Sequence, residues 1–319
     1  MRTNTDPSSG ARPGIDRPLR LGTRQSPLAM VQAKMTAKAI LKAQRWSADQ
    51  IELVPMIASG DKILDRSLAE VGGKALWTKE LDRALATGEI DAAVHSMKDV
   101  ETIRPEQFVI AAMLKRADIR DRLVGAENID SLPHGAIVGT ASPRRKAQLL
   151  RQRSDLDIRL VRGNVQTRLA KIEAGEYAAS LLAAAGLDRL GMGDIGKEIP
   201  DQVMLPAPAQ GAIGIETLRE ASGVRELLSA ISCSATFRAV MAERTFLAEL
   251  TADCHSPVAA NAMVQGDKIL FRAEILLPDG SESVGDTVTF AIDDENAPAQ
   301  LARSLLARSS AKLQAVFGR

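Results

Sequence analysis

Three sequence features occur in this chain in one order and then occur again, and this internal repeat constrains the fold more than any other feature. The first set comprises LGTRQSP (21–27), IELV (51–54) and TGEIDAAV (87–94), and the second comprises VGTASPRR (138–145), IRLV (158–161) and AGEYAASL (174–181). Each Gly-Thr stretch follows a strand-like apolar run and precedes a helix-like one. Because each repeat can build its own sheet and covering helices, the pattern predicts two similar α/β lobes.

The turn shared by the two halves has the chemistry of a helix start. Ser26 and Ser142 suit the N-cap position. Pro27 and Pro143 follow them at the first helical position, where a missing N–H costs nothing. A helix that begins in this way offers free backbone N–H donors to an anion. One such turn is typical of any well-capped helix, but two, each beside arginines, favour anion sites that face each other across a cleft.

The rest of the chain predicts a return crossing between the lobes and then a separate α+β unit. Residues 200–216, which contain several Pro and Gly residues, are expected to cross back to the first lobe. The third unit is expected to comprise a helix over 235–250, strands over 258–264, 268–276 and 284–292, and a final helix over 297–317. The expected division is a disordered tail at 1–17, domain 1 at 18–115 and 207–231, domain 2 at 116–206, and domain 3 at 232–319.

Composition argues against several classes of partner. Lys and Arg number 41 against 40 Asp and Glu, and aromatic residues make up 3%, which is unlike a nucleic-acid-binding protein. No apolar run approaches the roughly 20 residues of a membrane span, and the first residues lack the apolar core of a signal peptide. The 2 cysteines and 3 scattered histidines form neither a disulfide framework nor metal-ligand spacing. We therefore expect a cytoplasmic protein without a metal, a nucleic-acid partner or a membrane partner.

The densest positive region spans residues 142–169. Arg144 and Arg145 lie in the first turn of the second predicted helix, where cations oppose the helix dipole. We therefore expect both to bind an external anion. Arg162 and Arg168 flank a loop and can close on the same ligand, because forked guanidinium groups bind carboxylates or phosphates.

The first lobe contributes the stretch DAAVHSMKDV, at residues 91–100. Its first residues indicate a strand, so Lys98 and Asp99 fall at the carboxyl end, where α/β sheets place ligands. Lys98 favours the ionised form of Asp99, and an ionised carboxylate can stabilise a developing cation. The alternative is a surface Lys-Asp pair at the start of the next helix. His95 is expected to be a hydrogen-bonded strand residue rather than a base.

Three further features are less specific. Gly72 and Gly73 indicate a flexible loop, which is either a lid over the cleft or an ordinary solvent loop. Gln210, in the return crossing, is expected beside the cleft. Cys233 is expected to be a small buried hydrophobic residue, whereas Cys254 lies in a turn between a helix and a strand.

Ten stretches along residues 19–319 closely resemble the porphobilinogen deaminase (hydroxymethylbilane synthase) family. They are GTRQSPLA, ELVPM, GDKILD, VGGKALWTKEL, AVHSMKDV, IVGTASPRR, RGNVQTRL, AAAGLDRLG, LPAPAQGAIGIE and CHSP. Any one of them is weakly specific, whereas ten in the family's order are a strong signal. The resemblance implies three domains: two α/β lobes like those of a type II periplasmic binding protein, and a small α+β C-terminal domain.

The resemblance also implies a covalent cofactor and a reaction. In this family the cysteine that matches Cys254 carries a dipyrromethane through a thioether, which the enzyme assembles from its own substrate and uses as a primer. Four porphobilinogen molecules are added in turn with loss of ammonia, and water releases the linear tetrapyrrole. The expected protein is a monomeric transferase of tetrapyrrole and heme biosynthesis.

The resemblance assigns roles to individual residues. Asp99 is expected to be the catalytic carboxylate that stabilises the cation formed as ammonia leaves, with Arg24 assisting proton transfer. The residues expected to hold the cofactor are Cys254, Lys98, Thr140, Ser142, Arg144 and Arg145. The residues expected to bind substrate are Arg24, Ser26, Gln32, Trp77, Arg162, Arg168 and Gln210. No metal is expected.

The chain departs from the family pattern at several loop positions. Ala252 and Asp253 precede Cys254 where two glycines are common, and Ala209 replaces a glycine in the return crossing. Glu101 stands where proline is frequent. If the cysteine loop needs a positive φ, Asp tolerates it better than most residues but worse than Gly. None of these departures removes a charged catalytic group.

Two other functions are compatible with parts of the sequence. A bilobal binding protein for a small anion, without catalysis, accounts for the two lobes but not for the third domain or Cys254. A nucleic-acid-binding protein has to explain the balanced charge and the scarcity of aromatic residues.

Overall fold

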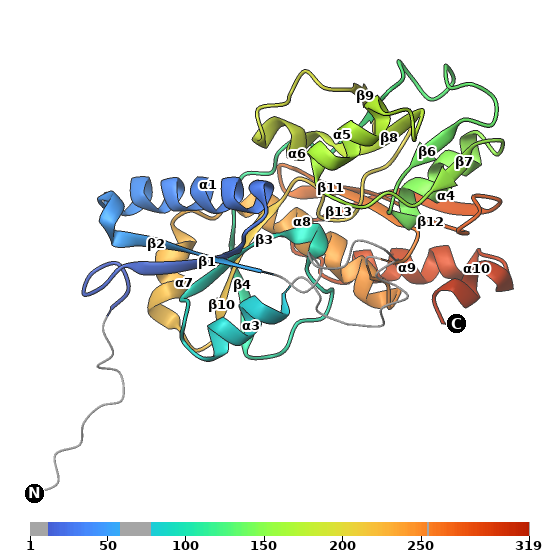
Figure 1. The fold of residues 1–319 in the computed structure, drawn as a ribbon. Coiled ribbons are helices and arrows are strands. Elements are labelled where there is room, and N and C mark those ends of the chain that lie inside the picture. Colours follow the sequence, from blue (N-terminus) through green and yellow to red (C-terminus); the bar gives the residue numbers. More distant parts are fainter. Residues whose placement is uncertain (1–11, 58–77, 254, 319) are drawn as a thin grey trace, which may run out of the picture.

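The computed structural model describes residues 12–57, 78–253 and 255–318 and divides them among three sheets (Figure 1). Two five-stranded sheets form the predicted pair of lobes, and a three-stranded sheet forms domain 3. Lobe 1 lies on the left of Figure 1, lobe 2 at the upper right and domain 3 below lobe 2. The predicted fold class is confirmed. Each sheet takes its strands from one expected domain range, while the exact boundaries stay a prediction.

The sheet of lobe 1 has the strand order β2-β1-β3-β10-β4. Its strands are β1 (Leu19–Arg24), β2 (Ile51–Met56), β3 (Ala92–Ser96), β4 (Phe108–Met113) and β10 (Ile213–Leu218). Its helices are α1 (Pro27–Gln44), α3 (Lys79–Ala86) and α7 (Ser222–Ser229), with 3-10 turns η1 (Ala48–Gln50) and η3 (Met97–Asp99). Because successive strand residues face opposite sides, Ala92 packs with α1 and α7 while Ala93 packs with α3.

Lobe 2 repeats this arrangement, with the strand order β7-β6-β8-β5-β9. Its strands are β5 (Asp121–Val124), β6 (Ile137–Gly139), β7 (Asp157–Arg159), β8 (Ala179–Ala183) and β9 (Lys197–Ile199). Its helices are α4 (Pro143–Gln152), α5 (Val165–Glu173) and α6 (Ala184–Arg189). In each lobe three parallel strands stand beside one antiparallel strand, β10 or β5, that the chain reaches by crossing from the other lobe. The predicted repeat is therefore confirmed in the sheet topology.

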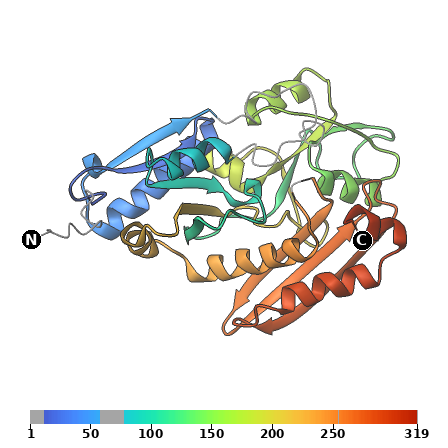
Figure 2. The same cartoon turned by 90° about the horizontal axis from the view of Figure 1, so that it is seen from below.

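Domain 3 packs an antiparallel sheet against helices, and its first helix lies between that sheet and lobe 1 (Figure 2). Its elements are α8 (Ser234–Glu249), β11 (Val258–Gln265), β12 (Lys268–Leu276), β13 (Ser283–Ala291), α9 (Ala297–Ala307) and α10 (Ala311–Val316). Phe246 and Phe271 lie in its core with ring centroids 5.6 Å apart. The single final helix expected over 297–317 is wrong, because Ser310 interrupts it and caps α10 by accepting the Leu313 N–H at 3.2 Å.

Residues 12–17, which the sequence placed in a disordered tail, pack on lobe 1 instead. Arg17 donates two hydrogen bonds of 2.7 Å to the carboxylate of Asp91. The carbonyl oxygen of Gly14 accepts from Gln50 Nε2 at 2.6 Å, and a Cβ at Gly14 would overlap the ring of Trp46. The composition of this segment is typical of a tail, but these contacts fix its conformation.

A buried carboxylate of domain 3 holds the two crossings between the lobes. Glu243 of α8 is fully buried. It accepts hydrogen bonds from Arg116 Nη1 at 2.6 Å and from the N–H groups of Ala262 and Ala209 at 2.7 and 2.5 Å. Arg116 lies in the crossing from lobe 1 to lobe 2, and Ala209 lies in the return crossing. Ala209 has a φ of 61°, so its backbone adopts a left-handed conformation that glycine tolerates better.

We expect Glu243→Gln to lower the free energy of unfolding by about 3 kcal/mol, because Arg116 would lose its buried counter-charge. Urea unfolding followed by circular dichroism measures the change. Glu226→Gln, on the exposed side of α7, is the matched control, with an expected change of less than about 0.5 kcal/mol. Equal unfolding midpoints for wild type and Glu243→Gln would contradict the role given to this carboxylate.

Candidate functional site

The predicted helix caps are present in both lobes. Ser26 Oγ accepts a hydrogen bond from the Ala29 N–H at 3.4 Å, at the start of α1. Ser142 Oγ accepts one from the Arg145 N–H at 3.4 Å, at the start of α4. Proline follows each cap, as the sequence predicted. Both helix starts are confirmed, while the ligand contacts expected of the two serines stay a prediction.

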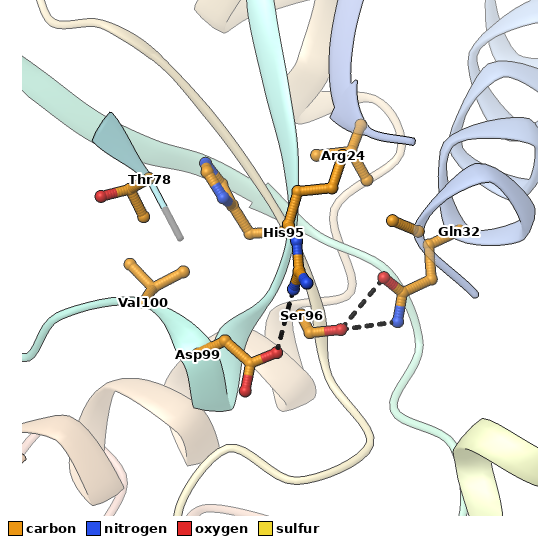
Figure 3. A pocket seen from close by; sticks show the side chains of 9 residues that line it. Arg24, Gln32, Thr78, His95, Ser96, Asp99 and Val100 are labelled. Atoms are coloured by element: carbon orange, nitrogen blue, oxygen red, sulfur yellow. Dashed lines mark hydrogen bonds and ion pairs between the residues drawn. The ribbon is translucent and has the colours of Figure 1, made fainter. Parts of the chain in front are cut away.

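Asp99, the expected catalytic carboxylate, lines a pocket in lobe 1 (Figure 3). It lies in η3, directly after β3, at the carboxyl end of the strand. Arg24 ends the neighbouring strand β1, and its Nη1 lies 3.9 Å from Asp99 Oδ2. Because the carboxyl ends of parallel strands meet at one edge of a sheet, two residues far apart in the sequence form one charged pair.

A contact between two side chains separates this pocket from a second one. The amide of Gln32 contacts Ser96 Oγ through its nitrogen at 2.8 Å and its oxygen at 3.0 Å (Figure 3). Both residues line both pockets. The second pocket lies between lobe 1 and α6, and Lys98 and Arg189 line it. Gln32, an expected substrate ligand, therefore lies in the wall between two hollows.

Lys98 presents a positive charge to the second pocket. Its side chain is accessible to solvent, although protein surrounds it at longer range. This surrounding protein desolvates the ammonium and lowers its pKa. Asp99 opposes the shift, and Arg145 adds to it. A bound anion would therefore stabilise the charged form of Lys98.

A carboxylate that the sequence analysis missed, Asp121, brings together three expected site residues. It is buried and accepts hydrogen bonds from Arg144 Nη2 at 2.8 Å, Arg145 Nη2 at 2.7 Å and Gln210 Nε2 at 2.9 Å. Burial alone raises the pKa of Asp121, but the charges and hydrogen bonds of the two arginines outweigh burial and hold the pKa below its usual range. Asp121 stands between two arginines in the sequence, and only the fold brings it to α4.

The expectation that Arg144 and Arg145 bind an external anion stays a prediction, although both arginines already have an anionic partner within the protein. Both side chains are buried and pair with Asp121, so the protein itself supplies the anion that offsets their position at the start of α4. The Nε–H groups of both arginines are buried without a hydrogen-bond partner in the part of the chain that the structure describes. These two donors are available only to a group that enters the buried site.

Thr140 and Gln210 have partners within the protein. Thr140 Oγ1 accepts the Ser142 N–H at 3.1 Å and so shapes the turn that leads into α4. Gln210 Nε2 also donates to the Ile119 carbonyl oxygen at 2.7 Å. Since Ile119 lies in the first crossing, Gln210 joins the two crossings beside Asp121.

Arg168 of α5 lies in a positively charged, partly buried surrounding. Burial lowers its pKa to about 10, and the positive charges of Arg145 and Arg162 add to the effect. Its Nε donates to the Gly163 carbonyl oxygen at 3.2 Å, but no carboxylate among the described residues pairs with it. The structure therefore brings Arg162 and Arg168 together near the start of α4, close to Arg145.

Two expected site residues, Trp77 and Cys254, lie outside the described residues, as does the glycine loop considered as a lid. The residues that flank Cys254 form a turn in which Asp253 Oδ1 accepts the His255 N–H at 2.8 Å. The left-handed residue of this region is Thr251, with a φ of 54°. The positive φ that we considered for Asp253 is therefore found at Thr251, two residues earlier.

The remaining cysteine and acidic groups give no sign of a metal centre. Cys233 is half-buried rather than buried as expected, and it stands at the N-cap of α8, where hydrogen bonding with Thr236 lowers its pKa.

Within residues 12–57, 78–253 and 255–318, no three His, Cys, Asp or Glu side chains are placed to hold a metal ion. Over the same ranges, no helix combines the length and apolar character needed to cross a membrane.

A buried charge network lies beside the Asp99 pocket. Glu216 of β10 is fully buried and accepts from Arg104 Nε at 2.9 Å and Nη2 at 3.0 Å. His95, a buried residue of β3 as expected, lines the pocket with its Nε2 3.2 Å from Glu216 Oε2. The two side chains are in contact without the alignment of a hydrogen bond. Burial alone raises the pKa of Glu216, but His95 and Arg104 outweigh burial and lower the pKa to about 2.

The network predicts an acid-dependent part of the stability. Because the pKa of Glu216 falls from 4.5 to about 2 on folding, its contribution is complete above pH 4.5 and is lost as the pH falls toward 2. In this window we expect the free energy of unfolding of wild type to fall more steeply than that of Glu216→Gln, by up to about 1.4 kcal/mol per pH unit. Urea unfolding across the window measures the difference, and parallel pH profiles would contradict it.

Comparison with known proteins places this geometry in a family. Residues 19–226 match the family model described as "Porphobilinogen deaminase, dipyromethane cofactor binding domain", and residues 237–308 match "Porphobilinogen deaminase, C-terminal domain". A porphobilinogen deaminase from Sphingopyxis alaskensis is 54% identical over 308 residues, which cover 95% of this chain and 97% of that protein. One from Paracoccus denitrificans is 46% identical over 94% of this chain and 97% of that protein.

Solved structures of other proteins also match. A TRAP periplasmic solute binding protein from Desulfovibrio salexigens has a TM-score of 0.40 and 12% identity, over 68% of this chain and 72% of that chain. The matches to the deaminase domains and relatives, in contrast, extend over nearly the whole sequence at high identity. The chain therefore belongs to the porphobilinogen deaminase family.

Proposed function

We propose that the protein joins four porphobilinogen molecules in turn, with loss of ammonia, onto a dipyrromethane primer attached to Cys254. Water then releases the linear tetrapyrrole hydroxymethylbilane. The observation that carries the proposal is the pairing of Asp99 with Arg24 in one pocket, next to a second pocket lined by Lys98. A substrate that carries both an ammonium leaving group and carboxylates requires groups of both charges in this arrangement.

The cations around the site fit a group that is rich in carboxylates, as dipyrromethane is. Burial lowers the pKa values of Lys98 and Arg168, so a bound carboxylate would offset the desolvation of both. Among the described residues, Arg144 and Arg145 each retain a buried Nε–H without a partner. When bound, the group supplies the pyrrole carbon to which the first substrate is joined.

Asp99 is proposed to accept the pyrrole N–H of the substrate and to stabilise the positive charge that develops as ammonia departs. A carboxylate fixed in η3 does this without reorganising during the reaction. Arg24 is proposed to bind a substrate carboxylate and to assist proton transfer near the leaving ammonia. Its position 3.9 Å from Asp99 supports a shared role at one reacting centre.

The other expected ligands are proposed to surround this centre. Arg162 and Arg168 would bind carboxylates of the growing chain from lobe 2, and Gln32 would contact it from lobe 1. Ser26, Trp77 and Gln210 remain proposed substrate ligands, and Thr140, Ser142, Arg144 and Arg145 remain proposed cofactor ligands. The monomeric state, the cytoplasmic location and the lack of a nucleic-acid partner stay predictions from the sequence.

The intact mass of the full-length protein tests the covalent primer. We expect wild type to carry an added mass equal to two linked pyrroles and Cys254→Ser to carry none. Cys233→Ser is the matched control and is expected to retain the addition. A wild-type protein that stays unmodified after incubation with porphobilinogen would overturn the proposal and would favour a noncatalytic anion-binding protein.

Asp99→Asn tests the proposed catalytic carboxylate. We expect turnover to fall about 100-fold to 1000-fold, because the loss of one preorganised electrostatic group costs several kcal/mol of barrier. The rates of porphobilinogen consumption and hydroxymethylbilane formation by the loaded enzyme measure the effect. Asp267→Asn, in the exposed turn between β11 and β12, is the control and is expected to leave turnover unchanged. Near-normal turnover in Asp99→Asn would remove this residue from the mechanism.

A further inference from the structure

One arginine of domain 3 holds the backbone that follows Asp99. Arg244 of α8 is 6% exposed and donates to three consecutive carbonyl oxygens, those of Val100, Glu101 and Thr102, at 3.3, 2.6 and 2.9 Å. The planar guanidinium offers its donors in a fixed fork, so it fixes the orientation of these carbonyls. The segment therefore presents Thr102 to domain 3 from a position three residues beyond Asp99.

The lobe 1 side of this segment is anchored as well. The carboxylate of Glu101 accepts from Arg104 Nη1 at 2.6 Å and from Thr78 Oγ1 at 3.0 Å. Arg104 in turn binds the buried Glu216 of β10. Thr102 is consequently attached to a well-fixed part of lobe 1, which allows it to define the position of a loop in another domain.

The side chain of Thr102 makes a hydrogen bond to the end of α8. Its Oγ1 donates to the carbonyl oxygen of Ala252 at 3.0 Å, and Ala252 is buried. The N–H groups of Thr251 and Ala252 donate back to the carbonyl oxygens of Ala248 and Leu247, each at 3.0 Å, and so close the helix end. The carbonyl of Ala252 lies beyond that closure and relies on Thr102.

The peptide group that joins Ala252 to Asp253 is therefore fixed at both edges. Its C=O accepts from Thr102, and its N–H donates to Ser256 Oγ at 3.1 Å. Because a peptide group is planar, hydrogen bonds to its C=O and from its N–H together set its rotation about the chain. The orientation of the backbone at Asp253, the last described residue before Cys254, thus depends on a hydroxyl group of lobe 1.

We propose that Thr102 is a positioning residue that fixes the Ala252–Asp253 peptide group, immediately before Cys254 in the sequence, for assembly of the dipyrromethane. This inference rests on the proposed function. In the attachment step the thiol sulfur forms a C–S bond to the aminomethyl carbon of porphobilinogen, the C–N bond breaks, and the thiol proton leaves with the amine nitrogen as ammonium. Thr102 takes no part in these bond changes and acts through the backbone of Ala252.

Hydrogen exchange of the full-length, cofactor-free protein tests the contact itself. Thr102→Val removes the hydroxyl with little change in volume, and Thr102→Ser keeps a hydroxyl as the matched control. We expect the peptide covering residues 247–258 to exchange about fivefold faster in Thr102→Val, as for the loss of one neutral hydrogen bond, and at the wild-type rate in Thr102→Ser. The peptide covering β12 is expected to exchange alike in all three proteins.

The rate at which the intact mass gains dipyrromethane during incubation with porphobilinogen tests the role. We expect loading to be several-fold slower in Thr102→Val and unchanged in Thr102→Ser. A Thr102→Val protein that exchanges and loads like wild type would overturn the inference, as would slow loading that Thr102→Ser does not rescue. Failure of wild type to load would overturn the proposed function, whereas exchange would still decide whether Thr102 holds the turn. If Thr102→Val does not fold, Thr102→Ala takes its place in both measurements.

Discussion

The connection of lobe 2 to the return crossing depends on one buried ion cluster, in which the carboxylate of Asp121 binds Arg144, Arg145 and Gln210. Asp121 begins β5, the arginines lie in the first turn of α4, and Gln210 belongs to the return crossing. The cluster therefore joins the sheet of lobe 2, its first helix and the route back to lobe 1. Because a buried carboxylate and buried guanidiniums are each costly without a partner, these groups are stable only together.

Glu243, a second buried carboxylate, links the two crossings to domain 3. It binds an arginine and accepts hydrogen bonds from backbone N–H groups. The main hydrophobic clusters of lobe 1, lobe 2 and domain 3 are separate. A smaller cluster, in which Val240 of α8 packs near Met97, joins domain 3 to lobe 1. For lobe 2 the described residues contain no such shared cluster, so polar contacts carry much of its attachment.

Local chemistry could be predicted from the sequence, whereas pairings between distant segments could not. The Ser26 and Ser142 caps depend on neighbours within one helical turn, and the structure confirms both. The partner of Arg144 lies 23 residues away on another element, and nothing in the local pattern distinguishes Asp121 from the acids near it. The ordered residues 12–17 were missed for the same reason, since Arg17 is fixed by an acid 74 residues away. The position of Asp99 at the carboxyl end of a strand followed from the strand prediction, whereas Arg24 was assigned from the family resemblance.

The contact between Gln32 and Ser96 forms the boundary between the two pockets that both residues line. These side chains lie in the wall between the two hollows. Rotation of the Gln32 amide would break this contact. Such a rearrangement is local, whereas hinge motion of whole domains takes microseconds to milliseconds. A change at this boundary therefore needs only the exchange of hydrogen bonds by two side chains.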